Sequence, residues 1–140
     1  MSDIKDQPKP VATDRRPAWE LVIDFAQMRR NIFAVAPKEE LNLRAVKILD
    51  LLIEDMRKRD RVGRERYGVP LTAGNGRNHL VDAYQEALDQ VVYLRAWLDE
   101  RGVDFQGPPT SDEHEQVVIS LFIDGLAHLI AMRQLIDQGA

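Results

Sequence analysis

Apolar residues recur at steps of three and four along four segments of the chain, which is the spacing of one face of an α-helix. The first predicted helix starts near Pro17, a favourable first-turn residue. Its polar residues fall on the other side, as in an amphipathic helix. The apolar stripe is made of Leu21, Phe25, Met28 and Ile32.

The second predicted helix starts near Pro37 and runs to about Val62, where Gly63 weakens the helical pattern. Residues 63–78 contain four glycines and a proline and are predicted to form a loop. The core stripe predicted for this helix is Leu41, Ala45, Ile48, Leu52 and Met56.

The third predicted helix covers residues 79–100, with Asn78 as its N-cap. The fourth follows a capping box of Thr110 and Glu113 and reaches about Asp137. Its apolar residues are nearly continuous, so we expect it to be buried on several sides, either as the central helix or in a dimer interface.

The sequence therefore predicts an all-α fold, a four-helix bundle-like single domain over residues 17–140 that is oligomeric. Residues 1–16 are polar with two prolines, and we expect a flexible tail. We see no strand-like alternation.

Composition narrows the function classes. The net charge of −4 disfavours a general nucleic-acid binder, which is usually basic. The chain has no cysteine, which excludes thiolate chemistry, and its three histidines match no zinc motif. The N-terminus lacks a signal-peptide pattern, and no uninterrupted apolar run reaches the roughly 18 residues that span a membrane. We therefore expect a cytoplasmic protein that does not contact the membrane.

An acidic row lies on the third predicted helix, opposite its core stripe. Asp82, Glu86 and Asp89 fall within about 60° of arc, and carboxylates of this kind bind magnesium together with substrate phosphates. Tyr93 and Trp97 continue the same face, which indicates contact with a helix, a subunit or a ring-shaped ligand. A solvated acidic face is the alternative.

A second acidic pair, Asp50 and Glu54, lies one turn apart on the second predicted helix. Two acidic pairs on two helices could hold a shared metal. The alternative is an ion pair from Glu54 to Lys58, which stand at the favourable spacing of four residues.

A basic cluster interrupts this acidic chain, and arginine suits bidentate phosphate binding. The alternative is a solvated basic helix end, where positive charge favours the helix dipole. The candidate phosphate-binding residues are Arg57, Lys58, Arg61, Arg64, Arg66 and, just before the third helix, Arg77.

Asp124 and His128 stand one turn apart on the apolar fourth helix. Such a pair can orient an imidazole for acid–base work. The more ordinary interpretation is a satisfied polar pair in the core or at an interface.

The stretch RERYGVPL…NGRNHLVDAYQEALDQVVYLRAWLDE resembles small phage and bacterial proteins related to the MazG-like all-α nucleotide pyrophosphohydrolases, over about a third of the chain. In that superfamily one helix carries Glu-x-x-Glu and a later helix carries Glu-x-x-Asp, and together they bind magnesium. Glu86-Ala-Leu-Asp89 matches the second half. The first half departs from the pattern, because Asp50 and Glu54 are four residues apart.

The resemblance implies a magnesium-dependent enzyme, with manganese as an alternative metal, that splits a nucleoside triphosphate into a monophosphate and pyrophosphate. It implies that Glu86 and Asp89 are catalytic metal ligands, that Asp82, Asp50 and Glu54 assist them, and that the protein is a homo-oligomer such as a homodimer. The candidate base contacts are Tyr67, Asn75 and Trp97. Two alternatives remain open: a non-catalytic helical interaction module, and a nucleotide-binding protein that does not hydrolyse.

Overall fold

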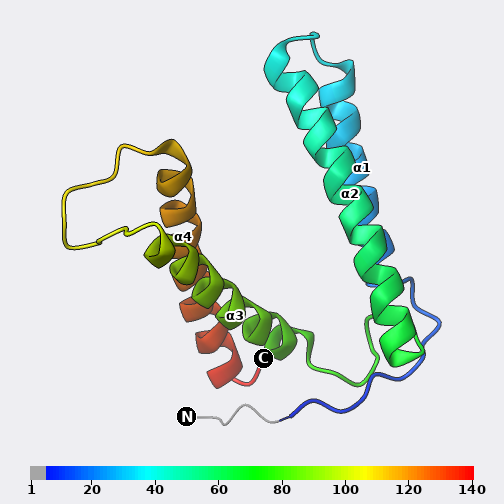
Figure 1. The fold of residues 1–140 in the computed structure, drawn as a ribbon. Coiled ribbons are helices and arrows are strands. Elements are labelled where there is room, and N and C mark those ends of the chain that lie inside the picture. The colour runs from blue at the N-terminus through cyan, green and yellow to red at the C-terminus, as the bar shows by residue number, and fades with distance from the viewer. Residues whose placement is uncertain (1–5) are drawn as a thin grey trace. The chain divides into compact units, whose positions relative to one another are not determined.

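The computed structural model describes residues 6–140, and these residues form four α-helices and no β-strand. The helices are α1 (Ala18–Val35), α2 (Glu40–Tyr67), α3 (His79–Glu100) and α4 (Glu113–Asp137), shown in Figure 1. The predicted all-α class is therefore confirmed.

The chain divides into two compact units, each built on a pair of neighbouring helices. One unit comprises Pro8–Arg77 and contains α1 and α2. The other contains α3 and α4 within Asn78–Ala140, together with Asp6 and Gln7 from the N-terminal segment. Whether residues 17–140 behave as one domain stays a prediction.

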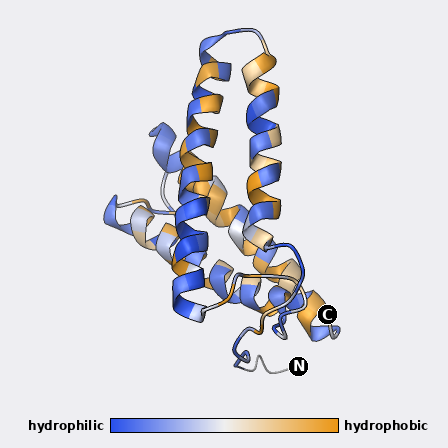
Figure 2. Ribbon diagram, turned by 90° about the vertical axis from the view of Figure 1, so that its right-hand side faces the viewer, coloured by the Kyte–Doolittle hydropathy of each residue, from blue (hydrophilic) through white to orange (hydrophobic). Residues whose placement is uncertain are grey.

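The α1–α2 hairpin packs through a face of α1 that the sequence analysis did not select. Ala26 is 6% exposed and Ile23 is half-buried on this face, and Ile53 of α2 is 3% exposed. The stripe predicted from Leu21 to Ile32 is instead 50–61% exposed. The reason is that α1 is apolar on two opposite sides, and only one side meets α2. Figure 2 shows hydrophobic and hydrophilic segments alternating along both helices of this hairpin.

The second helix begins at Glu40, three residues after Pro37, and ends at Tyr67, five residues later than predicted. Gly63 lies inside α2, where the Asp60–Arg64 ion pair, 2.9 Å long, spans it. A single internal glycine costs only about 1 kcal/mol, which the surrounding helix tolerates. The helix ends at Tyr67, because Gly68 adopts a left-handed conformation with φ of 73° and its N–H donates to the carbonyl of Arg64.

Part of the N-terminal segment is held against the loop that follows α2. The N–H of Val11 donates to the carbonyl of Asn75 at 2.9 Å, and the hydroxyls of Thr13 and Thr72 are 2.7 Å apart. Thr72 and Asn75 are both buried, at 1% and 0% exposure. These contacts join residues 11–13 to the loop, and the flexibility predicted for residues 1–16 stays a prediction. Residues 1–5 lie outside the described part of the chain.

The N-cap of α3 is the predicted residue, whereas the N-cap of α4 is Asp112 and not the predicted Thr110. The side chain of Asn78 accepts hydrogen bonds from the N–H groups of Leu80 and Val81 at 3.0 and 3.2 Å, so it is the N-cap of α3. At α4 the N-cap is Asp112, which accepts from the N–H of Glu115 at 3.0 Å. The hydroxyl of Thr110 instead donates a hydrogen bond to the Glu115 carboxylate.

The core of the α3–α4 hairpin lies along one side of each helix. The buried residues are Val81, Val91 and Leu98 of α3 and Gly125, Leu129 and Ile136 of α4. Within the single chain α4 is not buried on several sides, since Val117, Leu121, Ile123 and Ile130 are each at least half exposed. The alternative expectation, burial in a dimer interface, stays a prediction. By length and composition alone, α4 is also long and apolar enough to cross a membrane, a property that core helices share.

Candidate functional site

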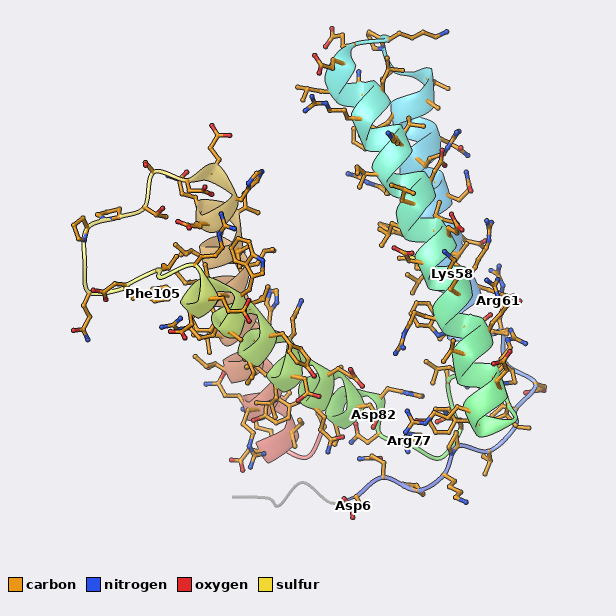
Figure 3. The ribbon with its side chains drawn as sticks, viewed as in Figure 1. Asp6, Lys58, Arg61, Arg77, Asp82 and Phe105 are labelled. Carbon is orange, nitrogen blue, oxygen red and sulfur yellow. The ribbon has the colours of Figure 1, made fainter. Side chains whose placement is uncertain are left out.

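The acidic row of α3 faces away from α4. Val91 and Leu98 mark the buried side of α3, and Glu86 and Asp89 lie nearly opposite them at about 100° of rotation per residue. Both carboxylates are exposed, and neither takes part in a hydrogen bond or ion pair among residues 6–140. Asp82, labelled in Figure 3 in the first turn of α3, is half-buried. Glu86 and Asp89 are thus available to bind a cation.

Two aromatic side chains follow the acidic row towards the end of α3. Tyr93 is 72% exposed. Trp97 is half-buried, and the guanidinium of Arg101 lies 4.5 Å from the centre of its ring. One face of Trp97 is therefore occupied by a cation–π contact, and a base could stack only on the other face.

The two acidic candidates on α2 are already paired with cations. Asp50 accepts two hydrogen bonds from Arg30 of α1, at 2.9 and 3.4 Å, and hydrogen bonding to Asp50 raises the pKa of Arg30. Glu54 forms an ion pair with Lys58 at 3.1 Å, as the alternative interpretation predicted. Either carboxylate would have to leave its partner to bind a metal, so the two do not form a ready half-site.

The described residues offer two carboxylates rather than an acidic cage. Among residues 6–140 no group of three or more histidine, aspartate or glutamate side chains is placed to hold a metal ion. Magnesium is often held by one or two carboxylates, with waters and substrate phosphates completing its octahedron. Glu86 and Asp89 fit that requirement, and a site built wholly from protein ligands does not fit.

The basic candidates separate into free and engaged side chains. Arg57 and Arg61 are exposed, one turn apart on α2, and neither has an ion-pair partner among the described residues. Figure 3 shows Arg61 and Lys58 projecting from α2. Lys58 and Arg64 are held in ion pairs by Glu54 and Asp60.

The remaining basic candidates lie at the two ends of the loop after α2. The guanidinium of Arg66 lies 5.3 Å from the centre of the Tyr67 ring. Arg77 donates to the carbonyl of Pro8 at 2.6 Å, which ties it to the N-terminal segment. Arg57 and Arg61 are consequently the best-placed residues to meet a phosphate.

The candidate base contacts differ in their exposure. Tyr67 is 52% exposed, whereas Asn75 is fully buried. The side-chain oxygen of Asn75 accepts from the N–H of Arg77 at 3.1 Å, within a turn where Gly74 and Gly76 adopt left-handed conformations. Asn75 therefore stabilises the loop and does not present a surface to a base. Its position between two glycines is the sequence signal for this turn.

Residues of the N-terminal segment also contribute to this loop, and no local sequence signal predicts their contacts. Thr13 bonds Thr72, and the Arg15 guanidinium Nε lies 3.7 Å from where a Cβ on Gly74 would stand. Asp124 and His128, expected inside a core or an interface, are both exposed on α4.

Comparison with known proteins gives no relative: no family model, curated protein or solved structure matches the chain. The resemblance to the MazG-like superfamily therefore stays a prediction that only the residues of α3 and α2 support.

Proposed function

We propose that this protein is a magnesium-dependent nucleoside triphosphate pyrophosphohydrolase. The observation that carries the proposal is the pair of exposed, unpaired carboxylates of Glu86 and Asp89 on the outer face of α3. Other carboxylates, such as Asp50 and Glu54, are neutralised by arginine or lysine. A free pair separated by one helical turn has the charge and spacing to share a divalent cation.

In this proposal Glu86 and Asp89 are the residues that would hold the magnesium. The metal, when bound, polarises the phosphate and lowers the pKa of a bound water. Hydrolysis adds the elements of water across the bond between the α- and β-phosphates, so a nucleoside monophosphate and pyrophosphate are formed. Arg57 and Arg61, exposed on α2 in the other unit, are separate candidates for contact with phosphate oxygens.

Tyr93 is the aromatic residue best exposed beside the acidic pair, and Tyr67 is the more exposed of the other candidates. An exposed tyrosine ring provides a flat apolar surface for a base, with little conformational freedom to lose on binding. Asn75 is left out of this role because it is buried. Manganese would substitute for magnesium through the same oxygen ligands.

The test is an assay of pyrophosphate release from the common ribo- and deoxyribonucleoside triphosphates, with magnesium or manganese and with EDTA as the control. The proposal predicts release of pyrophosphate and the matching monophosphate from at least one nucleotide, and its loss in EDTA. Nucleotide binding that persists in EDTA without any release would instead identify a binding protein that does not hydrolyse.

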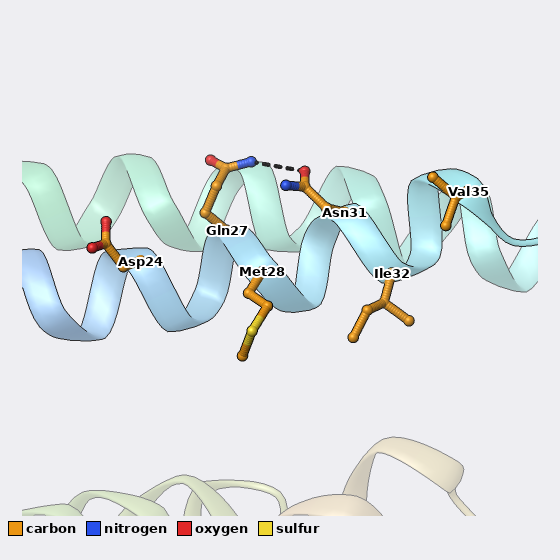
Figure 4. Close-up of a pocket in the computed structure, with 6 residues that line it drawn as sticks. All are labelled: Asp24, Gln27, Met28, Asn31, Ile32 and Val35. Carbon is orange, nitrogen blue, oxygen red and sulfur yellow. Dashed lines mark hydrogen bonds between the residues drawn. The ribbon is translucent and has the colours of Figure 1, made fainter.

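A helical interaction module is the second candidate, and the outer face of α1 favours it. Leu21, Phe25 and Met28 are 50–61% exposed on that face. Figure 4 shows Met28 and Ile32 projecting from the same side of α1, where they line an open groove of about 490 Å³. Exposed apolar faces of this kind commonly mark protein contacts. A protein that neither binds nor cleaves any nucleotide would favour this candidate.

A further inference from the structure

One flank of α4 carries a six-residue stripe that continues through the helix at steps of four, three, four, three and four residues. This alternation is the spacing of a helix face that packs along another helix. The stripe lies about 100° around α4 from the buried side that meets α3, so contact with α3 leaves it open. Its members are Val117, Leu121, Asp124, His128, Ala131 and Leu135.

All six side chains of this stripe are exposed. Val117, Leu121 and Leu135 are 59%, 50% and 47% exposed. Asp124 and His128 are exposed in the middle of the stripe, and neither has a hydrogen bond or ion pair among residues 6–140. An acid and a base, both without a partner, thus stand between apolar residues.

The stripe is symmetric about Leu126. Asp124 and His128 are equally distant from this residue, as are Leu121 and Ala131, and Val117 and Leu135. When a second copy of α4 runs in the opposite direction about a two-fold axis at Leu126, every residue of the stripe meets its mirror position. Asp124 then faces His128 of the other copy twice, and the remaining layers are apolar.

We propose that two copies of this chain associate through an antiparallel pairing of their α4 helices along this stripe. Burial of the apolar layers drives the association. The two Asp–His contacts fix its direction and register, because a parallel pairing would place Asp124 against Asp124 and His128 against His128. A buried polar pair commonly selects register in paired helices in this way.

The charges argue for a second copy over other occupants. The order of acidic, basic and apolar residues along the stripe is complementary to the same order read in the opposite direction. A second copy of α4 therefore matches it, whereas a different protein would need the same arrangement independently. A lipid surface is the remaining class, and it disfavours an aspartate in the middle of an apolar face. The pairing leaves the outer face of α3 open, so it does not depend on the proposed enzyme activity.

A charge-exchange series tests the pairing in the full chain by sedimentation velocity over a range of concentrations. His128→Asp places Asp against Asp124 and should weaken the dimer at least about tenfold, because like charges that face one another across an interface cost several kcal/mol. The double variant Asp124→His with His128→Asp restores two opposite pairs and should restore the wild-type dimer. Asp14→Lys, at an exposed site outside α4, is the charge control.

Direction is tested by disulfide trapping, which is clean because the chain has no cysteine of its own. Leu121→Cys and Ala131→Cys proteins are mixed in a glutathione redox buffer. The antiparallel pairing predicts the mixed disulfide between the two variants in excess over either homodimer.

Circular dichroism confirms that each variant is folded before its association is compared. Four results would overturn the proposal: a wild-type monomer at every concentration, full association of folded His128→Asp, a folded double variant that stays monomeric, or a preference for the disulfide-linked homodimers. Binding of the wild type to phosphatidylcholine vesicles without dimerisation in solution would also overturn it and assign the face to lipid.

Discussion

Gly125 of α4 lies so close to Val91 of α3 that a Cβ added to the glycine would come within 2.8 Å of Val91 Cγ1. Glycine at this position therefore sets how closely the two helices approach. The contact explains why a helix otherwise rich in β-branched and large residues carries a glycine at its centre, despite the poor helix propensity of glycine.

Gly125→Ala should therefore destabilise the protein. The steric overlap lowers the free energy of unfolding by about 1–3 kcal/mol, and the better helix propensity of alanine offsets about 1 kcal/mol of this loss. We expect a net loss of roughly 1 kcal/mol in the free energy of unfolding, measured with urea and circular dichroism. Gly63→Ala is the matched control, because nothing lies within 4 Å of its Cβ position, and it should stabilise the protein. Equal effects of the two substitutions would contradict the close packing at Gly125.

The hydrogen bond between Thr13 and Thr72 should contribute to the stability of the α1–α2 unit. Thr72 is 1% exposed and its partner lies 59 residues away, so the bond anchors the N-terminal segment to the loop. A double-mutant cycle with Thr13→Val and Thr72→Val should give a coupling energy of about 1 kcal/mol. A coupling energy near zero would mean that the segment is not held there in solution.

Asp112 should make the stability of the protein depend on pH in acid. The N–H of Glu115 donates to the carboxylate of Asp112, and Nη2 of Arg101 lies 3.6 Å from Oδ2 of that carboxylate. Both interactions lower the pKa of Asp112 below its ordinary value of 3.8. A carboxylate with a lowered folded-state pKa stabilises the fold above its unfolded-state pKa, and this contribution is lost as the pH falls through the folded-state value.

The matching experiment compares wild type with Asp112→Asn in urea melts between pH 6 and pH 2. The wild type should be the more stable protein at pH 6, and the difference should shrink steadily as the pH falls through the lowered pKa. A difference that is unchanged at pH 2 would show that the charge of Asp112 does not contribute.

Much of the fold could be predicted from sequence because its signals are local. The limits of α3 follow from the Asn78 cap and from the breakers on either side, and the Glu54–Lys58 pair follows from its spacing. The predicted end of α2 is too early, because a single glycine, Gly63, does not end a helix that is otherwise favourable. The packing face of α1 could not be chosen by pattern, since this helix is apolar on two opposite sides.

The candidate site was less predictable because its decisive contacts are not local. The sequence position of Asp50 is compatible with a metal ligand, but Arg30, twenty residues away on another helix, binds its carboxylate. Asn75 looked accessible in a glycine-rich loop, and its burial depends on the return of Val11 and the N-terminal segment. Glu86 and Asp89 stayed candidates, because a helix face opposite a clear apolar stripe can be placed by periodicity alone.

Arg57 and Arg61 should control nucleotide affinity if they bind phosphate as proposed. Each substitution by glutamine removes a charged hydrogen bond, and we expect affinity to fall about tenfold. Lys58→Gln is the control, since Lys58 is engaged by Glu54 one turn away. The measurement is calorimetric binding of a non-hydrolysable triphosphate at fixed salt. An effect of Lys58→Gln as large as that of Arg61→Gln would point to a general electrostatic attraction.

The most direct test of the account compares Glu86→Gln with Glu100→Gln in pyrophosphate release from the best nucleotide substrate with magnesium. Both glutamates are exposed on α3, but only Glu86 stands beside Asp89. We predict that Glu86→Gln lowers kcat at least about a hundredfold, because the metal supplies several kcal/mol of catalysis, while Glu100→Gln retains activity. Wild-type activity in the folded Glu86→Gln protein would contradict the assignment of the α3 carboxylates as the metal site.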